Sequence, residues 1–570
     1  MSPSYPDPDE TRPLLQHPSS DSLDSYNSLD DATASTPPVP VSLNKISRAD
    51  LMWVLAGLWS AVFLGALDGT IVATLLSPIG SYFNESNRSS YIGTSYLLSV
   101  CCFTPLYGRL SDILGRKGAM LLALSFFGSG TLLCGLAPSM DALIAARAIA
   151  GMGGGGVMTV SSVAVTDLIP LRQRGLYQGM TNILFGLGAG LGGPLGGWMN
   201  DAFGWRSAFL LQMPLLVFSF VLVALKVSIK LPDEVESQST HAKLRRIDFF
   251  GSFTLVGTVG CLLLGLSLKS TEEMPWSHPV IWGLLVASVV FGGLFVAVET
   301  YYSPYPVMPM RLIKQRTPLA VSLSNFFGSV AAFSMLYNVP LYFSAVKLNS
   351  STDAGLHLLP HSVAISTGSV FAGWMMRKTG KLYTLTLCSS VLTVVATALV
   401  ALWNDDTRAY HLWVDIVPQG FGMASVITTT LIAMIANVGR EDLAVATGIT
   451  YLFRTTGQVI GVSLSGALLQ AILTTKLRER ISGPDAFQII EDIRHSTSII
   501  PTLSPHLRKA AVDSYADALR VVFICQAAMN FLCLLCCLAI QESPLPGTHE
   551  EQEAQYRKRK NTISRTDSES

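Results

Sequence analysis

A repeated series of apolar segments, each about 20 residues long, constrains this chain more than any other feature of its sequence. A segment of that length crosses the ~30 Å hydrocarbon core of a bilayer as an α-helix. Hydrophobic residues make up 49% of the 570 residues and charged residues 14%, which is not the balance of an ordinary soluble enzyme. We therefore predict an all-α, multi-pass membrane protein with about fourteen transmembrane helices. The predicted crossings are 51–82, 91–107, 119–137, 143–168, 177–199, 208–227, 250–268, 280–301, 319–346, 355–376, 382–402, 412–436, 445–473 and 519–540.

Basic residues in the predicted loops set the expected orientation, because Lys and Arg accumulate on the cytosolic side of membrane proteins. Both termini are expected in the cytosol, and no cleavable signal peptide is expected because the first fifty residues are polar. The segment 474–517 is interpreted as a long loop, whose basic residues count little in this rule. The short basic loops contain Arg109, Arg116 and Lys117; Arg172 and Arg174; Lys243, Arg245 and Arg246; Arg311, Lys314 and Arg316; and Arg377, Lys378 and Lys381.

Two kinds of short motif concern the surface of the protein. Three glycosylation sequons fall on the predicted non-cytosolic side, where they are usable. In the polar N-terminal segment, Glu10, Leu14 and Leu15 resemble the acidic dileucine signal that sorting adaptors recognise on cargo for vacuoles or lysosomes. Patterns of both kinds also arise by chance. The sequons begin at Asn84, Asn87 and Asn349.

Two charged residues lie inside predicted crossings, where an ionised side chain costs on the order of 3 kcal/mol on insertion scales. Asp68 lies about 25 Å along an outward helix that starts near Leu51. Arg147 lies about 9 Å below the non-cytosolic start of an inward helix near Asp141. Both residues are therefore at similar depth in the outer half, and we predict that they pair and couple protons to substrate. The alternative is a fixed structural ion pair.

The stretch GRLSDILGRKG, residues 108–118, follows the second predicted crossing. Gly108 allows another helix to approach closely. Asp112 suits the N-terminus of a helix, where the macrodipole favours an anion. Arg116 can pair with a carboxylate, and Asp167 at the cytosolic end of the fourth helix is the candidate. We predict that this cluster is a gate on the cytosolic side.

The same stretch resembles the signature of the major facilitator superfamily between its second and third helices. LDGTIVAT around Asp68, and Arg147 within AARAIAGMGGGG, resemble the fourteen-helix drug:proton antiporter branch of that superfamily. Ile113 stands where the signature usually has a basic residue. The matching signature residues are Gly108, Asp112, Gly115, Arg116 and Lys117.

FGLGAGLGGPLGGW, residues 185–198, resembles the antiporter motif in the fifth helix of that branch. One residue, Leu195, follows the proline before the next glycine pair, where two are expected, so the register of the kink stays open. Arg454 matches a basic position of the branch and is a candidate gate or counter-charge. The antiporter-motif candidates are Gly188, Gly192, Gly193, Pro194 and Gly197.

The resemblance covers residues 51–540 and implies the major facilitator fold, with two six-helix bundles and two extra helices. We predict a disordered cytosolic tail at 1–49, a bundle at 50–230 and a linker with the two extra helices at 231–310. A second bundle follows at 311–542, and a disordered cytosolic tail at 543–570. A monomer is expected, because the halves meet at one central site.

Other motifs are interpreted as structural. GMGGGG at 151–156 satisfies a dinucleotide-binding pattern, but it lies within a membrane helix and is interpreted as a close-packing face. Cys533 and Cys536 have no partner pair at zinc spacing. Asp415 is either a site or a solvated helix end, and Glu299 is expected to snorkel from a cytosolic helix end. His357 and His361, one helical turn apart, could be metal ligands or proton carriers, but such a pair at an outer helix end more often faces water. We expect no enzyme, cofactor, metal or nucleic-acid partner.

The residues of these motifs resemble those of the fungal vacuolar transporters of basic amino acids most closely. This resemblance implies a proton-coupled antiporter that moves Lys, Arg or His from the cytosol into the vacuole. Asp68 would bind either a proton or the cationic substrate, and Arg147, Gln178 or Asn182 would hold the substrate carboxylate. The alternative is a plasma-membrane efflux pump for drugs or secondary metabolites. A membrane sensor that binds amino acids without transporting them is a third, weaker reading.

Overall fold

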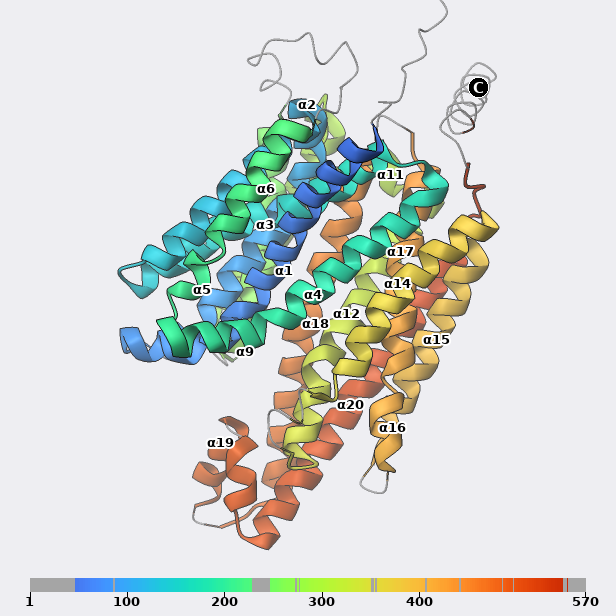
Figure 1. The fold of residues 1–570 in the computed structure, drawn as a ribbon. Coiled ribbons are helices and arrows are strands. Elements are labelled where there is room, and N and C mark those ends of the chain that lie inside the picture. Colours follow the sequence, from blue (N-terminus) through green and yellow to red (C-terminus); the bar gives the residue numbers. More distant parts are fainter. Residues whose placement is uncertain are drawn as a thin grey trace, which may run out of the picture. The chain divides into compact units, whose positions relative to one another are not determined.

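The computed structural model describes residues 47–85, 88–227, 247–271, 274–275, 277–349, 353, 356–404, 407–439, 442–483, 485–495, 497–546 and 551. The predicted sorting signal and Asn87 lie outside these residues. The regular elements of the described residues are all helices, and no strand is present among them (Figure 1). The helices are α1 (Arg48–Phe83), α2 (Ser90–Leu136), α3 (Met140–Leu168), α4 (Leu171–Phe203), α5 (Ser207–Leu210), α6 (Met213–Lys226), α9 (Phe249–Thr271), α10 (Pro279–Ala297), η2 (Val298–Tyr302), α11 (Met310–Ile313), α12 (Arg316–Ala345), α14 (Leu359–Thr379), α15 (Tyr383–Ala401), α16 (Ala409–Val414), α17 (Val417–Asn437), α18 (Leu443–Arg480), α19 (Ala486–His495), η4 (Thr497–Thr502) and α20 (Pro505–Leu538).

Eleven helices among the described residues are long and apolar enough to cross a membrane. The segment Tyr91–Leu136 counts as one of them, although its 46 residues would extend ~69 Å as one straight helix, more than twice the hydrocarbon core. Helices α4 and α14 have 33 and 21 residues but carry many small and polar residues, so they fall outside the eleven. The predicted number of fourteen crossings stays a prediction.

The chain reverses direction within α2 at Gly115. Its φ of 81° is a left-handed conformation that glycine adopts without strain. Both arms of α2 pack on the glycine face of α3: Gly151 lies against Tyr96 of the first arm, and Gly153 against Phe127 of the second. The motif GMGGGG is therefore a packing surface, as predicted, because a side chain on these glycines would meet backbone atoms of α2.

The helices pack mainly within two groups, which we call the N-terminal helices (α1–α6) and the C-terminal helices (α12–α20). In the first group α1 packs on α4 and α6, and α2 on α3; in the second, α12 packs on α18 and α20, and α15 on α17 and α20. Figure 1 shows the two groups in blue to green and in yellow-green to red. The extra helices α9 and α10 pack on each other, and α9 also contacts α2 and α18. The predicted domain boundaries stay predictions.

The segment 474–517 differs from the long loop that the sequence predicts. Helix α18 continues to Arg480, α19 and η4 follow, and α20 begins at Pro505. Apolar residues of this segment, among them Ile493 and Ile500, are buried in the same core cluster as Val339 and Phe343 of α12. The hydropathy pattern missed these helices because their outer faces are polar and charged.

Candidate functional site

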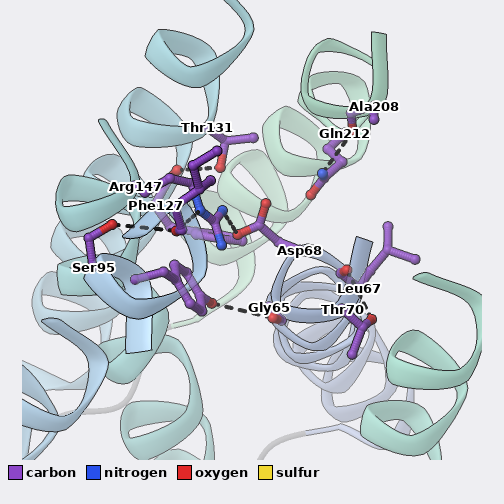
Figure 2. Close-up of polar contacts among 12 residues, drawn as sticks. Gly65, Leu67, Asp68, Thr70, Ser95, Phe127, Thr131, Arg147, Ala208 and Gln212 are labelled. Carbon is purple, nitrogen blue, oxygen red and sulfur yellow. Dashed lines mark hydrogen bonds and ion pairs between the residues drawn. The ribbon is translucent and has the colours of Figure 1, made fainter. Parts of the chain in front are cut away.

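Asp68 and Arg147, predicted to pair, are in direct contact inside the N-terminal helices. The guanidinium Nη1 of Arg147 on α3 lies 2.6 Å from Oδ2 of Asp68 on α1 (Figure 2). The side chains are 1% and 0% exposed. Arg147 also donates from Nε to the Ile92 carbonyl oxygen at 3.4 Å, and its Cζ lies 4.2 Å from the Tyr96 ring centre. Such a buried pair persists because each charge compensates the other.

The two carboxylate oxygens of Asp68 differ in their contacts. Oδ1 is buried and has no hydrogen-bond partner among the described residues. Gln212, between α5 and α6, appears in the same close-up (Figure 2). Its Nε2 donates to the Ala208 carbonyl oxygen at 2.9 Å, and its Oε1 is likewise buried without a described partner. A buried acceptor without a donor is costly, so Oδ1 is the Asp68 oxygen whose bonding the site leaves incomplete.

The predicted gate residues meet at the end of the protein that carries Arg116, Arg172 and Arg377, which we call the basic end. Arg116 donates from Nη1 to Asp112 Oδ1 and from Nε to Asp167 Oδ2, both at 2.6 Å. Lys117 is exposed. Arg116 thus ties the bend of α2 to the end of α3, both within the N-terminal helices.

Gly108 connects this cluster to the C-terminal helices. A Cβ on Gly108 would lie 2.7 Å from the carbonyl oxygen of Ala444, in the first turn of α18. Asp112 follows one turn later on α2, and its Oδ2 is buried without a described partner. The close approach of another helix at Gly108 is as expected, whereas the placement of Asp112 at a helix N-terminus stays a prediction.

The glycines of the antiporter motif divide into two sets. Gly188 and Gly192 lie against α1, where a side chain would meet Phe63 and Thr70. Gly196, which the sequence analysis did not select, lies against α1 in the same way, and its spacing of four from Gly192 was the available signal. A Cβ on Gly193 would touch only Thr74, at 3.7 Å, and one on Gly197 would meet nothing within 4 Å. Pro194 is exposed inside α4.

Arg454 on α18 contrasts with Arg147. It is half-buried, and no hydrogen bond or ion pair joins it to a described residue. Its one specific neighbour is the Tyr451 ring, whose centre lies 5.7 Å from its Cζ. Arg454 is eleven residues, ~16 Å, from the start of α18 at the basic end, which is near the middle of a bilayer.

The two groups of helices touch along α4 and α14 near the basic end. Gly175 lies against Gly373, and a Cβ on Gly179 would lie 3.0 Å from the Ser369 carbonyl oxygen. Farther along the same face, a Cβ on Gly186 would lie 3.4 Å from Ser366 Oγ. At Gly190 a Cβ would meet no described atom within 4 Å. Contact between these helices is thus tight at the basic end and ends beyond the middle of α4.

The weaker candidates were expected at solvated helix ends, but the structure buries them and gives them local partners. Asp415 accepts from Trp403 Nε1 at 3.1 Å and lies 3.2 Å from His411 Nδ1. Glu299 accepts from the backbone N–H groups of Val307 and Met308. His357 stacks between the rings of Phe343 and Trp413, and Nε2 of His361 lies 2.6 Å from Gln419 Oε1. Asn84, the first residue of a predicted glycosylation sequon, ends α1 with φ 57°.

Apolar helices around a buried ion pair, with glycine contacts between two helix groups, are typical of membrane transporters. The family model of the Major Facilitator Superfamily matches residues 58–462. This chain belongs to the Major Facilitator Superfamily and has its fold; it is a transporter, not an enzyme. The crystal structure of the human organic anion transporter MFSD10 resembles it in fold, with a TM-score of 0.52 at 15% identity over 84% of this chain and 98% of that one.

Named fungal relatives are more similar in sequence. Multidrug resistance protein fnx1 of Schizosaccharomyces pombe is 39% identical over 86% of this chain and 92% of its own. Vacuolar membrane amino acid uptake transporter fnx2 of the same yeast is 34% identical over 88% and 86%. Vacuolar basic amino acid transporter 1 of Saccharomyces cerevisiae is 33% identical over 72% and 76%. The relatives therefore include both vacuolar amino-acid transporters and a protein named for drug resistance.

Proposed function

We propose that this protein is a proton-coupled antiporter that moves basic amino acids from the cytosol into the vacuole by alternating access. The observation that carries the coupling is the sealed Asp68–Arg147 pair with its free carboxylate oxygen. The names of two of the relatives support the substrate class and the vacuolar membrane. The termini, and with them the basic end, face the cytosol in this proposal.

The proposed coupling follows from the charge balance of the pair. Protonation of Asp68 at Oδ1 removes the negative charge that holds Arg147, and an uncompensated guanidinium is costly to bury. The N-terminal helices must then rearrange. A proton from the acidic lumen occupies Asp68 in one arrangement of the helices, and a cationic amino acid from the cytosol binds between the helix groups in the other, so binding of one opposes binding of the other. Such competition is sufficient for antiport.

The gate supports the same cycle at the basic end. Arg116, Asp112 and Asp167 hold the N-terminal helices together while Gly108 lies against α18. Opening toward the cytosol requires α2 to leave α18 and α4 to leave α14. Arg454, which has no carboxylate of its own among the described residues, is our candidate counter-charge for the carboxylate of the substrate.

The second candidate function is efflux of drugs or secondary metabolites across the plasma membrane. The observation that favours it is the relative named a multidrug resistance protein, which has the highest identity of the three. The same ion pair and gate would serve that function. The difference lies in substrate charge and in location, so the experiment must test both.

The test is uptake of labelled lysine, arginine and histidine by vacuolar vesicles from cells with and without the protein. The proton gradient is raised with ATP and abolished with an uncoupler. We expect gradient-dependent uptake that is lost in Asp68→Asn. Asp415→Asn is the matched control, because Asp415 is also a buried carboxylate, 8% exposed, but belongs to the C-terminal helices. It is expected to keep its uptake.

Two outcomes would contradict the proposal in different ways. No uptake by the wild type, with the protein present in the vesicles, would reject the amino-acid substrate and favour efflux. Gradient-dependent uptake that survives Asp68→Asn would keep the substrate and reject the role of Asp68.

A further inference from the structure

Five polar side chains form one hydrogen-bonded chain across the interior, from α3 to α17. Ser162 donates to Gln178 Oε1 at 3.3 Å, and Gln178 donates to Asn182 Oδ1 at 3.3 Å. Asn182 donates from Nδ2 to Ser369 Oγ at 2.6 Å, and Ser369 lies 2.6 Å from Thr428 Oγ1. All except Asn182 are less than 5% exposed.

The hydrogen bonds among these five side chains all have the same direction, with each group donating to the next one toward α17. The hydroxyl of Thr428 donates to the Ala424 carbonyl oxygen at 2.9 Å, so its single proton is used. The Ser369 hydroxyl must therefore donate to Thr428 and accept from Asn182. Each group depends on its neighbour, and the bond between Asn182 and Ser369 joins the N-terminal to the C-terminal helices.

That bond lies at the inner limit of the contact between α4 and α14. Asn182 is eleven residues, ~16 Å, from the start of α4, the same depth along its helix as Arg454 on α18. On the side toward the basic end, Gly175 and Gly179 press against α14. On the other side, contact fades at Gly186 and is gone at Gly190.

Separation of α4 and α14 at the basic end must break this bond. The break leaves an N–H donor on Asn182 and a hydroxyl acceptor on Ser369, both at mid-membrane, where an unmet polar group is costly. A molecule that restores both bonds must offer an acceptor to α4 and a donor to α14. The carboxylate and α-ammonium of an amino acid offer these two groups on adjacent atoms.

We propose that Asn182 and Ser369 form a binding subsite for the α-amino-carboxylate group of the substrate, with Asn182 donating to the carboxylate and Ser369 accepting from the α-ammonium. The substrate thus replaces the bond between the helices when the basic end opens. This inference rests on the proposed amino-acid substrate and names residues that recognise it. It also explains why the mid-membrane contact is made of a neutral amide and a neutral hydroxyl: the closed contact buries no charge on either helix.

The test compares two analogues as inhibitors of labelled lysine uptake in vesicles from cells with the full chain. Cadaverine lacks the carboxylate, and 6-aminohexanoate lacks the α-ammonium. Asn182→Ala should raise the KM for lysine and the inhibition constant for 6-aminohexanoate by roughly tenfold and leave that for cadaverine unchanged. Ser369→Ala should raise the KM for lysine and the inhibition constant for cadaverine and leave that for 6-aminohexanoate unchanged. If an analogue does not compete in the wild type, labelled arginine replaces lysine, with agmatine as the analogue without the carboxylate and 5-guanidinopentanoate as the analogue without the α-ammonium.

Asn338→Ala is the matched control. Asn338 donates to Ser465 Oγ at 3.0 Å, the same pair of side chains, but both lie within the C-terminal helices. In this variant, the inhibition constants of the two analogues, each divided by the KM for lysine, should equal those of the wild type. Equal effects of Asn182→Ala on all compounds, or no effect, would overturn the subsite and leave only a contact between helices. Failure of the proposed function itself is recognised separately, as absence of gradient-dependent lysine uptake by the wild type.

Discussion

Two arginines within the membrane helices occupy opposite surroundings. Arg147, in the N-terminal helices, is 1% exposed and bonded to Asp68, whereas Arg454, in the C-terminal helices, is half-buried and has no carboxylate beside it among the described residues. The buried Asp68–Arg147 pair can respond to a proton, since protonation of the carboxylate leaves the guanidinium without a counter-charge. An open guanidinium can respond to an anion that arrives from outside. The difference suggests a division of work, with the proton bound on one side and the substrate carboxylate on the other.

The largest expected effect comes from breaking the sealed pair. Asp68→Asn leaves Arg147 buried without a counter-charge and should lower the free energy of unfolding by about 3–5 kcal/mol. Asp68→Asn with Arg147→Gln should recover most of that loss, because neither residue is then charged. Thermal unfolding of the purified protein in micelles measures both. An unchanged midpoint in Asp68→Asn would mean that the two charges are not mutually dependent.

The open arginine should respond in the reverse way. Arg454→Gln breaks no ion pair, so the free energy of unfolding should change by less than about 0.5 kcal/mol. The KM for lysine should rise about tenfold, because a charge-assisted bond to the substrate carboxylate is lost. Arg454→Lys should restore part of it. Uptake kinetics and unfolding are measured on the same preparations, and a large loss of stability without a change in KM would make Arg454 a structural residue.

The contact between the two helix groups can be weakened by one methyl group. Gly108→Ala places a Cβ 2.7 Å from a backbone oxygen of α18 and should destabilise the closed basic end by about 1–3 kcal/mol. A cysteine at Thr447, which is 0% exposed, should then react faster with a thiol reagent added at the basic end. Gly93→Ala is the control on the same helix, because its Cβ would meet nothing within 4 Å. Equal labelling in both variants would remove Gly108 from the gate.

The smallest expected effect concerns Asn84, because a glycan there shows which side of the membrane the Asp68–Arg147 pair lies toward. Asn84 ends α1 in a left-handed conformation, which Asp also tolerates but Gln does not. Asn84→Asp and Asn84→Gln should both remove one glycan, seen as a shift in gel mobility, and only Asn84→Gln should lower stability, by about 1 kcal/mol. A mobility unchanged in both variants would remove the sequon at Asn84 as support for the predicted orientation.

The sequence was sufficient to predict contacts that follow from the position of a residue along one helix or from its depth in the membrane. Asp68 and Arg147 could be paired from their distances along α1 and α3, and Arg116 with Asp167 from their places at one membrane face. The bond from Asn182 to Ser369 spans 187 residues between neutral side chains, and neither hydropathy nor charge indicates it. Gly196 was missed because the proline disturbed the register, although its spacing from Gly192 was visible. The folded segment after Arg480 was missed because its short helices bury only one face.

The central claim is that Asp68 binds the proton and not the substrate. Lysine exchange in vesicles without any gradient tests it most directly, because exchange needs substrate binding and alternating access but no net proton movement. We predict that Asp68→Asn, and Asp68→Asn with Arg147→Gln, lose gradient-driven accumulation of labelled lysine and retain exchange per molecule of folded protein. Loss of both activities to the same extent in the double variant, with the protein folded, would contradict the account.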